Sequence, residues 1–203
     1  MRTFSFGLAV VLVTSLIAST TQDETADLNA AGVIPDVLTG IDPVQSVRLD
    51  IKYGDTPITT NGGRLPQSDV SAAPSIQVTD LMGNLLSTLK LQPTKLYTLV
   101  LTDPDAPSPA MPTSREYLHW LVTNAPDGDI SKAQVVEPYA PPTPPAGVHR
   151  YVFSLFQQPN NAAIDVPIPA SRARFNTQKF AAQYKLGEPV QAAYFEVAAP
   201  GFE

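Results

Sequence analysis

The sequence contains no cysteine among its 203 residues, so no disulfide can stabilise the fold and stability has to come from a buried core. It also lacks any Asn-x-Ser/Thr acceptor, so N-glycosylation is not expected. Basic residues are few: 13 Lys and Arg stand against 19 Asp and Glu, for a formal net charge of −6. A field of this sign disfavours diffuse binding to nucleic acid or to anionic membranes. We therefore expect no nucleic-acid partner, and any anionic ligand needs a local site.

The amino-terminal residues carry the pattern of a secretory signal. Arg2 precedes an apolar run from Phe6 to Ala18, and small polar residues follow. A membrane-anchoring helix is the alternative, but the run is shorter than the roughly 20 apolar residues that span a bilayer. We expect cleavage after Ala18 or Thr20 and a secreted, extracellular protein. The length suits one domain, so the predicted organisation is a signal peptide at residues 1–20 and a single domain at residues 21–203.

Alternation of apolar and polar residues predicts a mainly β fold. Val47–Tyr53 alternates strictly, which is typical of a half-buried strand, whereas Leu96–Leu101 is apolar on both faces and is predicted to be a central strand. Further strands are expected at Ser75–Val78, Tyr117–Asn124, His149–Phe156 and residues 189–197. Helices are expected at Ala26–Ala31, ended by Gly32, and at Thr177–Leu186, capped by Asn176 and ended by Gly187. This pattern favours two packed sheets with a peripheral C-terminal helix.

Two carboxylates directly follow the central strand, in the stretch TDPDAPS at residues 102–108. Acidic residues around a proline ordinarily indicate a turn. Pro104 disfavours helical geometry for Asp103, however, and predicts an extended Asp103-Pro104-Asp105 unit. In that geometry both carboxylates point to one side of the chain.

The two histidines of the sequence, His119 and His149, lie on predicted strands, and Tyr117 and Tyr151 share their faces. Each histidine taken alone is expected to be half-buried with satisfied hydrogen bonds. Together with the two carboxylates, they have the composition of a small polar pocket in an apolar sheet. The proline-rich loop from Glu137 to Gly147 is either the rim of that pocket or a rigid connector.

Four stretches resemble the phosphatidylethanolamine-binding protein family in order and spacing: TDPDAPS at 102–108, EYLHWLVTN at 116–124, YAPPTPPAGVHRYVF at 139–153 and FAAQYKLGEPVQAAYF at 180–195. The resemblance extends over nearly all of the predicted mature chain. It implies a large antiparallel sheet packed on a smaller one, a C-terminal helix and a pocket for phosphate-like anions. It also implies a cis proline at Ala106-Pro107.

By position, the resemblance implies a ligand site formed by Asp103, Asp105, Tyr117, His119, Thr143, Pro145, His149 and Tyr151. It places Tyr139 at the start of the loop that lines the mouth. This sequence departs from the family pattern at Pro109, where many members carry an arginine. An ion pair beneath the pocket is therefore either missing or supplied by Arg115. Pro141 stands where glycine is usual, so the anion is expected to sit differently.

The predicted function is binding without catalysis, with no cofactor and no metal. A zwitterionic ligand explains two aspartates in an anion pocket. Carboxylates accept the ammonium of an ethanolamine or choline head group and keep histidines protonated, while the phosphate meets His149 and backbone amides. The expected ligands are therefore phospholipid head groups or other phosphate-bearing molecules.

Two other function classes compete with this one. The first is a regulator that binds a partner protein, such as an inhibitor of a serine carboxypeptidase that uses residues 21–29. The second is hydrolysis, which is disfavoured because the sequence has no GxSxG or HExxH motif. We expect a monomer.

Overall fold

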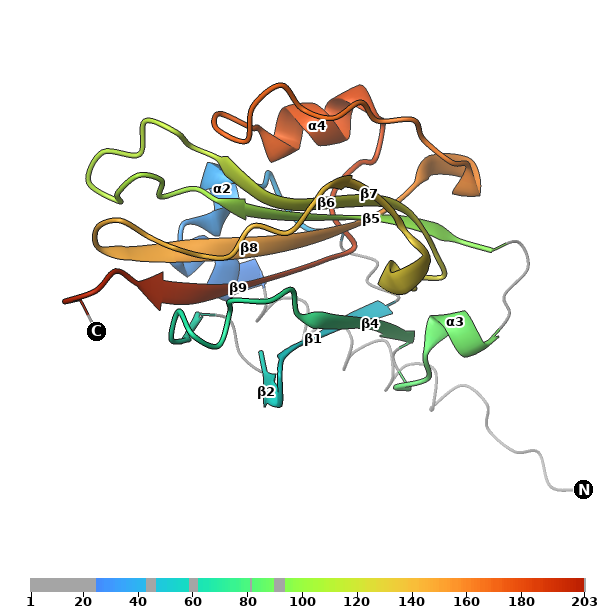
Figure 1. Cartoon of the computed structure of the whole chain (residues 1–203). Coiled ribbons are helices and arrows are strands. Elements are labelled where there is room, and N and C mark those ends of the chain that lie inside the picture. Colours follow the sequence, from blue (N-terminus) through green and yellow to red (C-terminus); the bar gives the residue numbers. More distant parts are fainter. Residues whose placement is uncertain (1–24, 43–46, 59–61, 81, 90–93, 203) are drawn as a thin grey trace, which may run out of the picture.

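The structure is a computed structural model that describes residues 25–42, 47–58, 62–80, 82–89 and 94–202. The predicted signal peptide at residues 1–20 and its cleavage sites lie outside these ranges. Within them, no helix has the length and apolar character needed to cross a membrane. The described chain forms two β-sheets, one above the other, with one helix on the outer side of the larger sheet and a short one beside the smaller sheet (Figure 1).

The smaller sheet has three antiparallel strands in the order β2 (Thr56–Pro57), β1 (Val47–Tyr53) and β4 (Ser75–Asp80). Strand β1 has the predicted bounds. Its residues Val47, Ile51 and Tyr53 are buried, while the polar residues between them are exposed. The alternation therefore orients one face of this sheet toward the core.

The larger sheet has six strands in the order β3 (Gly63–Arg64), β9 (Gln191–Ala198), β8 (Val148–Gln157), β5 (Leu96–Asp103), β6 (Tyr117–Pro126) and β7 (Gln134–Glu137). All neighbours are antiparallel except the short β3, which runs parallel to β9. Strand β5 is central and buried along nearly its whole length, as its apolar sequence predicted. The expected fold class, a large sheet packed on a smaller one, is confirmed.

Short helices complete the fold: α2 (Val33–Asp36), α3 (Leu86–Leu89), α4 (Thr177–Gln183) and the 3-10 turns η1 (Ile130–Lys132) and η2 (Pro159–Asn161). The expected helix near residue 26 is present at residues 25–30, and Gly32 has the left-handed φ of 67° that ends it. Asn176 caps α4 as predicted, by accepting a hydrogen bond from the Lys179 N–H. The predicted end at Leu186 is wrong, because α4 stops at Gln183 and Lys185 has a left-handed φ of 55°.

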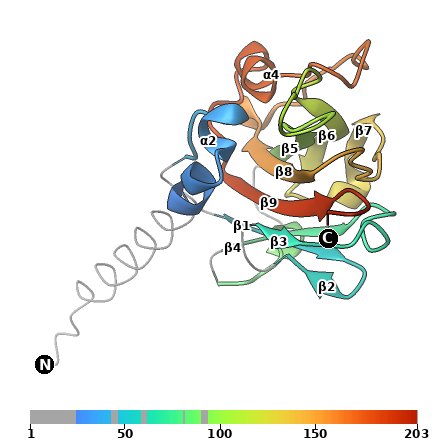
Figure 2. The ribbon, with the colours of Figure 1, turned by 90° about the vertical axis from the view of Figure 1, so that its left-hand side faces the viewer.

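Two apolar clusters hold these layers together. One lies between the sheets and includes Tyr53, Trp120, Tyr151 and Phe195. The other lies on the opposite face of the large sheet, under α2 and α4 (Figure 2). Side chains that alternate along β8 therefore enter different clusters: Tyr151 and Phe153 the first, Val152 the second. The two faces are called below the sheet-packed face and the helix-packed face.

Candidate functional site

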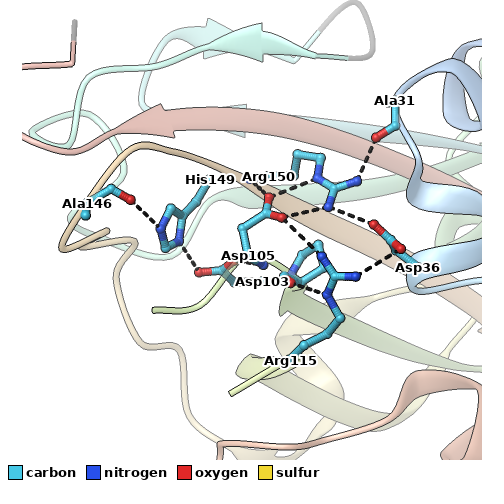
Figure 3. A network of polar contacts seen from close by, with 9 residues as sticks. Ala31, Asp36, Asp103, Asp105, Arg115, Ala146, His149 and Arg150 are labelled. Carbon is cyan, nitrogen blue, oxygen red and sulfur yellow. Dashed lines mark hydrogen bonds and ion pairs between the residues drawn. The ribbon is translucent and has the colours of Figure 1, made fainter. Parts of the chain in front are cut away.

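The two carboxylates after β5 do not point to one side, as an extended unit would require. The strand ends at Asp103, and residues 104–105 form a turn. The Asp103 carboxylate itself closes this turn, because its Oδ1 accepts the Asp105 N–H at 2.7 Å. Asp103 then binds His149, whereas Asp105 binds Arg150 (Figure 3). His149 and Arg150 are consecutive residues of one strand, so they face opposite sides of the sheet. The turn therefore supplies one carboxylate to each face.

His149 holds a buried positive charge on the sheet-packed face. Its Nδ1 lies 2.8 Å from Asp103 Oδ2, and its Nε2 lies 3.1 Å from the Ala146 carbonyl oxygen. Both neighbours are acceptors, so both ring nitrogens have to donate, and the ring is an imidazolium. Burial alone would lower the pKa of His149, but the hydrogen bond and charge of Asp103 outweigh it and raise the pKa. A carboxylate thus keeps this histidine protonated, as the sequence led us to expect.

His119 has the opposite character. Its Nδ1 donates to the Ala140 carbonyl oxygen at 2.7 Å, and burial lowers the pKa of the ring. The ring is therefore neutral, and its Nε2 carries a lone pair. Among the described residues, no group hydrogen-bonds to this nitrogen. His119 thus offers an acceptor beside the charged His149.

Tyrosine rings join the two histidines into one cluster. The ring of Tyr151 lies 5.1 Å from His119 and 6.4 Å from His149, measured between centroids. The ring of Tyr117 lies 5.1 Å from His119 on the other side and is partly exposed. Burial and the charge of Asp103 raise the pKa of Tyr151, so its hydroxyl stays protonated and can donate. Five of the predicted residues therefore come together: Asp103, Tyr117, His119, His149 and Tyr151.

The proline-rich loop lies between the two histidines. Its Ala140 carbonyl accepts from His119, and its Ala146 carbonyl binds His149, so each histidine fixes one end of the loop. The predicted residues Thr143 and Pro145 lie between these ends and are exposed. They are at the surface of the loop rather than in the buried cluster.

Asp105 belongs to an arginine network on the helix-packed face. Arg150 donates to it from the backbone N–H, from Nε and from Nη2 at 2.7–2.9 Å, and Arg115 lies 3.6 Å away. Both arginines also bind Asp36, and Arg150 Nη1 donates to the Ala31 carbonyl. Burial would raise the pKa of Asp105, but the hydrogen bonds and charge of Arg150 hold it below its usual range. The carboxylate is therefore committed to these arginines.

This network includes residues that the sequence did not reveal. Arg115 does supply an ion pair, with Asp36 and Asp105, as one of the two expectations had it. Arg150 and Asp36 were not predicted as partners of Asp105. The position of Arg150, polar and directly beside His149 on a buried strand, is the signal that could have revealed it. The Ala106-Pro107 peptide bond is cis, as the resemblance implied.

Glu116 is a buried carboxylate that sequence reasoning missed. It is 2% exposed and accepts hydrogen bonds from the Thr177 N–H at 2.9 Å and the Thr177 hydroxyl at 2.5 Å. These bonds attach the first turn of α4 to the start of β6. Burial raises the pKa of Glu116 to about 7. An acidic residue next to an otherwise apolar strand is the only sequence signal for it.

Comparison with known proteins supports the family resemblance of the sequence. The profile of the family described as "Phosphatidylethanolamine-binding protein" matches residues 55–196. TERMINAL FLOWER 1 of Arabidopsis thaliana is 39% identical over 164 residues, which cover 80% of this chain and 85% of that protein. MOTHER of FT and TFL1 homolog 2 of Oryza sativa subsp. japonica is 38% identical over 155 residues, covering 75% and 82%.

Solved structures share the fold at lower identity. A carboxypeptidase Y inhibitor, solved in complex with its cognate proteinase, matches with a TM-score of 0.73 and 24% identity, over 88% of this chain and 96% of that one. A phosphatidylethanolamine-binding protein from Plasmodium vivax matches with a TM-score of 0.65 and 21% identity, over 86% and 97%. At these identities the likeness concerns the fold alone.

Proposed function

Because the chain belongs to the phosphatidylethanolamine-binding protein family, we propose that it is a non-catalytic binding protein for small phosphate-bearing ligands, including phospholipid head groups. The observation that carries this proposal is the environment of His149. A carboxylate and a carbonyl oxygen on its two ring nitrogens keep the ring charged, and a fixed buried cation attracts a phosphate.

The surrounding groups suit a zwitterionic ligand. The Tyr151 hydroxyl and the N–H groups of the loop can donate to a phosphate, although the four prolines at 141, 142, 144 and 145 have no N–H to offer. The free Nε2 of His119 and the charge of Asp103 favour an ammonium group. A phosphoethanolamine-like ligand satisfies both kinds of group.

The same geometry supports a role without catalysis. A general base needs a nitrogen with a free lone pair, and neither nitrogen of His149 has one. His119 has such a nitrogen, but among the described residues no serine or threonine hydroxyl hydrogen-bonds to it. The pair Asp103–His149 therefore has the composition of part of a catalytic triad without its function.

Titration calorimetry of phosphoethanolamine and inorganic phosphate between pH 6 and pH 8 tests the proposal. We expect tighter binding of both at pH 6, since more of the His149 ring is protonated there than at pH 8. His149→Gln removes the cation and should weaken both ligands and flatten the pH dependence. Arg64→Gln, at an exposed ion pair with Glu196, is the matched control and should bind like wild type. Binding that is absent or identical in all three proteins would contradict the proposal.

Secretion is a second part of the proposal. It is supported by Arg2 and the apolar run that follows it, which have the order of a signal peptide. Expression of the full chain in a secreting host, followed by amino-terminal sequencing of protein from the medium, tests it. We expect a start between Ser19 and Asp23. Retention of Met1 in the secreted protein would exclude cleavage.

Inhibition of a serine carboxypeptidase is the alternative function. The fold likeness to a carboxypeptidase Y inhibitor supports it, because that protein was solved with its cognate proteinase. Carboxypeptidase Y activity should then fall in the presence of the chain and recover when residues 21–29 are deleted. His149→Gln separates the two functions, since it should impair phosphate binding while leaving inhibition through that segment intact.

A further inference from the structure

A groove of about 350 Å³ lies on the helix-packed face, between α4 and the segment of residues 166–175. Its lining includes the buried side chains of Leu121, Val166 and Phe180. Figure 1 shows α4 on the side of the large sheet that faces away from the smaller sheet. The groove and the histidine cluster are therefore on opposite faces of the large sheet, and the groove is separate from the ligand site proposed above.

Three aromatic rings form a row along this groove. The ring centroids of Phe175 and Phe180 lie 5.5 Å apart, and those of Phe180 and Tyr184 lie 5.0 Å apart. Phe180 is buried, whereas Phe175 and Tyr184 are partly exposed. Ile168, which follows the lining residue Pro167, is 75% exposed and extends the apolar surface beyond the groove. The row can therefore pack against an aromatic or aliphatic side chain of a ligand.

Backbone hydrogen bonds to the start of β6 fix the wall of the groove at residues 174–175. Phe175 and Glu116 exchange two of them, at 2.9 Å and 3.0 Å, and the Arg174 N–H donates to the Ser114 carbonyl oxygen at 3.1 Å. These bonds hold Arg174 in a left-handed conformation with a φ of 62°. The wall is therefore formed before a ligand arrives, which lowers the entropic cost of binding.

Two cations at the groove have no acidic partner. Arg174 and Lys179 both line it and are exposed, and within the described ranges neither side chain forms a hydrogen bond or an ion pair. None of the 19 acidic residues lies between positions 166 and 187, whereas four of the 13 Lys and Arg residues do. Of these four, Arg172 already binds Glu137 at 2.6 Å. The groove is therefore a local basic site on an acidic chain, and its charge is available to an acidic ligand.

We propose that this groove binds an acidic segment of a partner protein. An aromatic side chain of the segment packs on the row of Phe175, Phe180 and Tyr184, and carboxylates on each side of it pair with Arg174 and Lys179. Aromatic and arginine side chains are the residue types that contribute most to protein–protein interfaces. A segment of this composition uses both the apolar surface and the unpaired charges.

Two other occupants fit these observations less well. In a twofold dimer the same surface meets itself, so Arg174 and Lys179 of one copy would face the same cations of the other. An anionic membrane is typically bound by clusters of about four to eight basic residues. The stretch 166–187 has three cationic side chains without an acidic partner in the described chain, namely Arg174, Lys179 and Lys185. A concave groove with aromatic lining also suits a side chain better than a flat surface.

Amide NMR titration of the full chain with short capped peptides tests the proposal. The probe is acetyl-DEFDE-amide, which has a phenylalanine between acidic residues. We expect saturable shifts at amides between residues 172 and 184. The peptide acetyl-NQFNQ-amide keeps the ring without the charges, and acetyl-DEGDE-amide keeps the charges without the ring. Each should bind at least about fivefold more weakly than the probe.

Two double variants with the same change in net charge complete the test. Arg174→Gln with Lys179→Gln should weaken the probe at least about fivefold and leave phosphoethanolamine binding unchanged, because the histidine cluster is on the other face. The control is Arg48→Gln with Lys52→Gln, which removes two exposed cations of β1 and should bind the probe like wild type.

The proposal is overturned if the probe causes no saturable shifts, if the uncharged peptide binds as tightly, or if both double variants weaken binding equally. It is also overturned if the same amides shift with the concentration of the chain alone, which would indicate a second copy. Shifts with phosphatidylserine vesicles but not with the probe would overturn it in favour of a membrane.

Discussion

The helix-packed and sheet-packed faces of the large sheet use the two carboxylates of one turn in different ways. On the helix-packed face, Asp105 neutralises Arg150, a cation that stays charged at every physiological pH. On the sheet-packed face, Asp103 neutralises His149, whose charge can be lost. The same residue type at positions two apart therefore builds a permanent ion pair on one face and a titratable one on the other (Figure 3).

The two clusters also differ in how many of their polar groups are already bound to one another. The arginine network joins three segments that lie far apart in the sequence: Asp36, the connection that carries Asp105 and Arg115, and Arg150 of β8. Each of its charged groups forms an ion pair with another member of the network. The histidine cluster keeps a free acceptor on His119 and a protonated hydroxyl on Tyr151. The arginine network therefore holds the turn in place, whereas the histidine cluster keeps an acceptor that no group of the described residues uses.

The largest effect is expected from breaking the permanent pair. Arg150→Met removes the cation and leaves the buried carboxylate of Asp105 without its main partner, which should lower the free energy of unfolding by about 3–5 kcal/mol. The loss should be similar at pH 6 and pH 9, because the guanidinium that the substitution removes is charged at both values. Urea unfolding at both values measures it. A loss below about 1 kcal/mol would show that Arg115 alone neutralises the turn.

Glu116 gives the helix-packed face its own titratable group. Its folded pKa of about 7 lies above the ordinary value of 4.5, so the stability it contributes is present below pH 4.5 and is lost as the pH rises through 7. Glu116→Gln keeps the bonds to Thr177 without the charge. We expect the variant to be about 2–3 kcal/mol more stable than wild type at pH 8 and equal to it near pH 4. Thermal unfolding at both pH values checks this, and equal stability at pH 8 would contradict it.

The third prediction concerns the titratable pair on the sheet-packed face. The folded pKa of His149 is raised, so the stability it contributes is present below about pH 6.5 and is lost as the pH rises through the folded pKa. Asp103→Asn removes the charge that raises this pKa. The variant should be about 1–2 kcal/mol less stable than wild type at pH 6, with a smaller deficit at pH 9. NMR titration of the His149 ring should show a lower pKa; an unchanged pKa would assign the shift to another group.

The smallest effect on stability is expected at His119. A His119→Gln variant can still donate to the Ala140 carbonyl but loses the free ring nitrogen, and it should cost about 1 kcal/mol of stability or less. Calorimetry should show a larger loss of affinity for phosphoethanolamine than for inorganic phosphate, because only the former carries an ammonium group. Equal losses for both ligands would indicate that His119 does not contact the ammonium.

Much of the fold could be predicted from local patterns. The alternation at Val47–Tyr53 and the apolar run at Leu96–Leu101 identified an outer and a central strand. Neighbouring residues of a strand face opposite sides, so their order of apolar and polar types indicates whether one face or both faces are buried. The Asn176 cap was predictable for the same reason. The end of α4 could not be predicted in this way. Lys185 has a left-handed φ, and a lysine in the sequence gives no local indication of that conformation.

By itself, the sequence determined which residues carry charge at the end of the central strand and which strands carry the histidines. Only the tertiary structure decided how they pair. The Asp103 carboxylate accepts the Asp105 N–H and so closes a turn. The direction of each carboxylate therefore depends on that turn and on partners more than 40 residues later in β8. Glu116 likewise finds Thr177 only after α4 packs on the sheet. Strand faces follow from neighbouring residues, whereas ion pairs and buried pKa values follow from groups that meet only when the sheets and helices assemble.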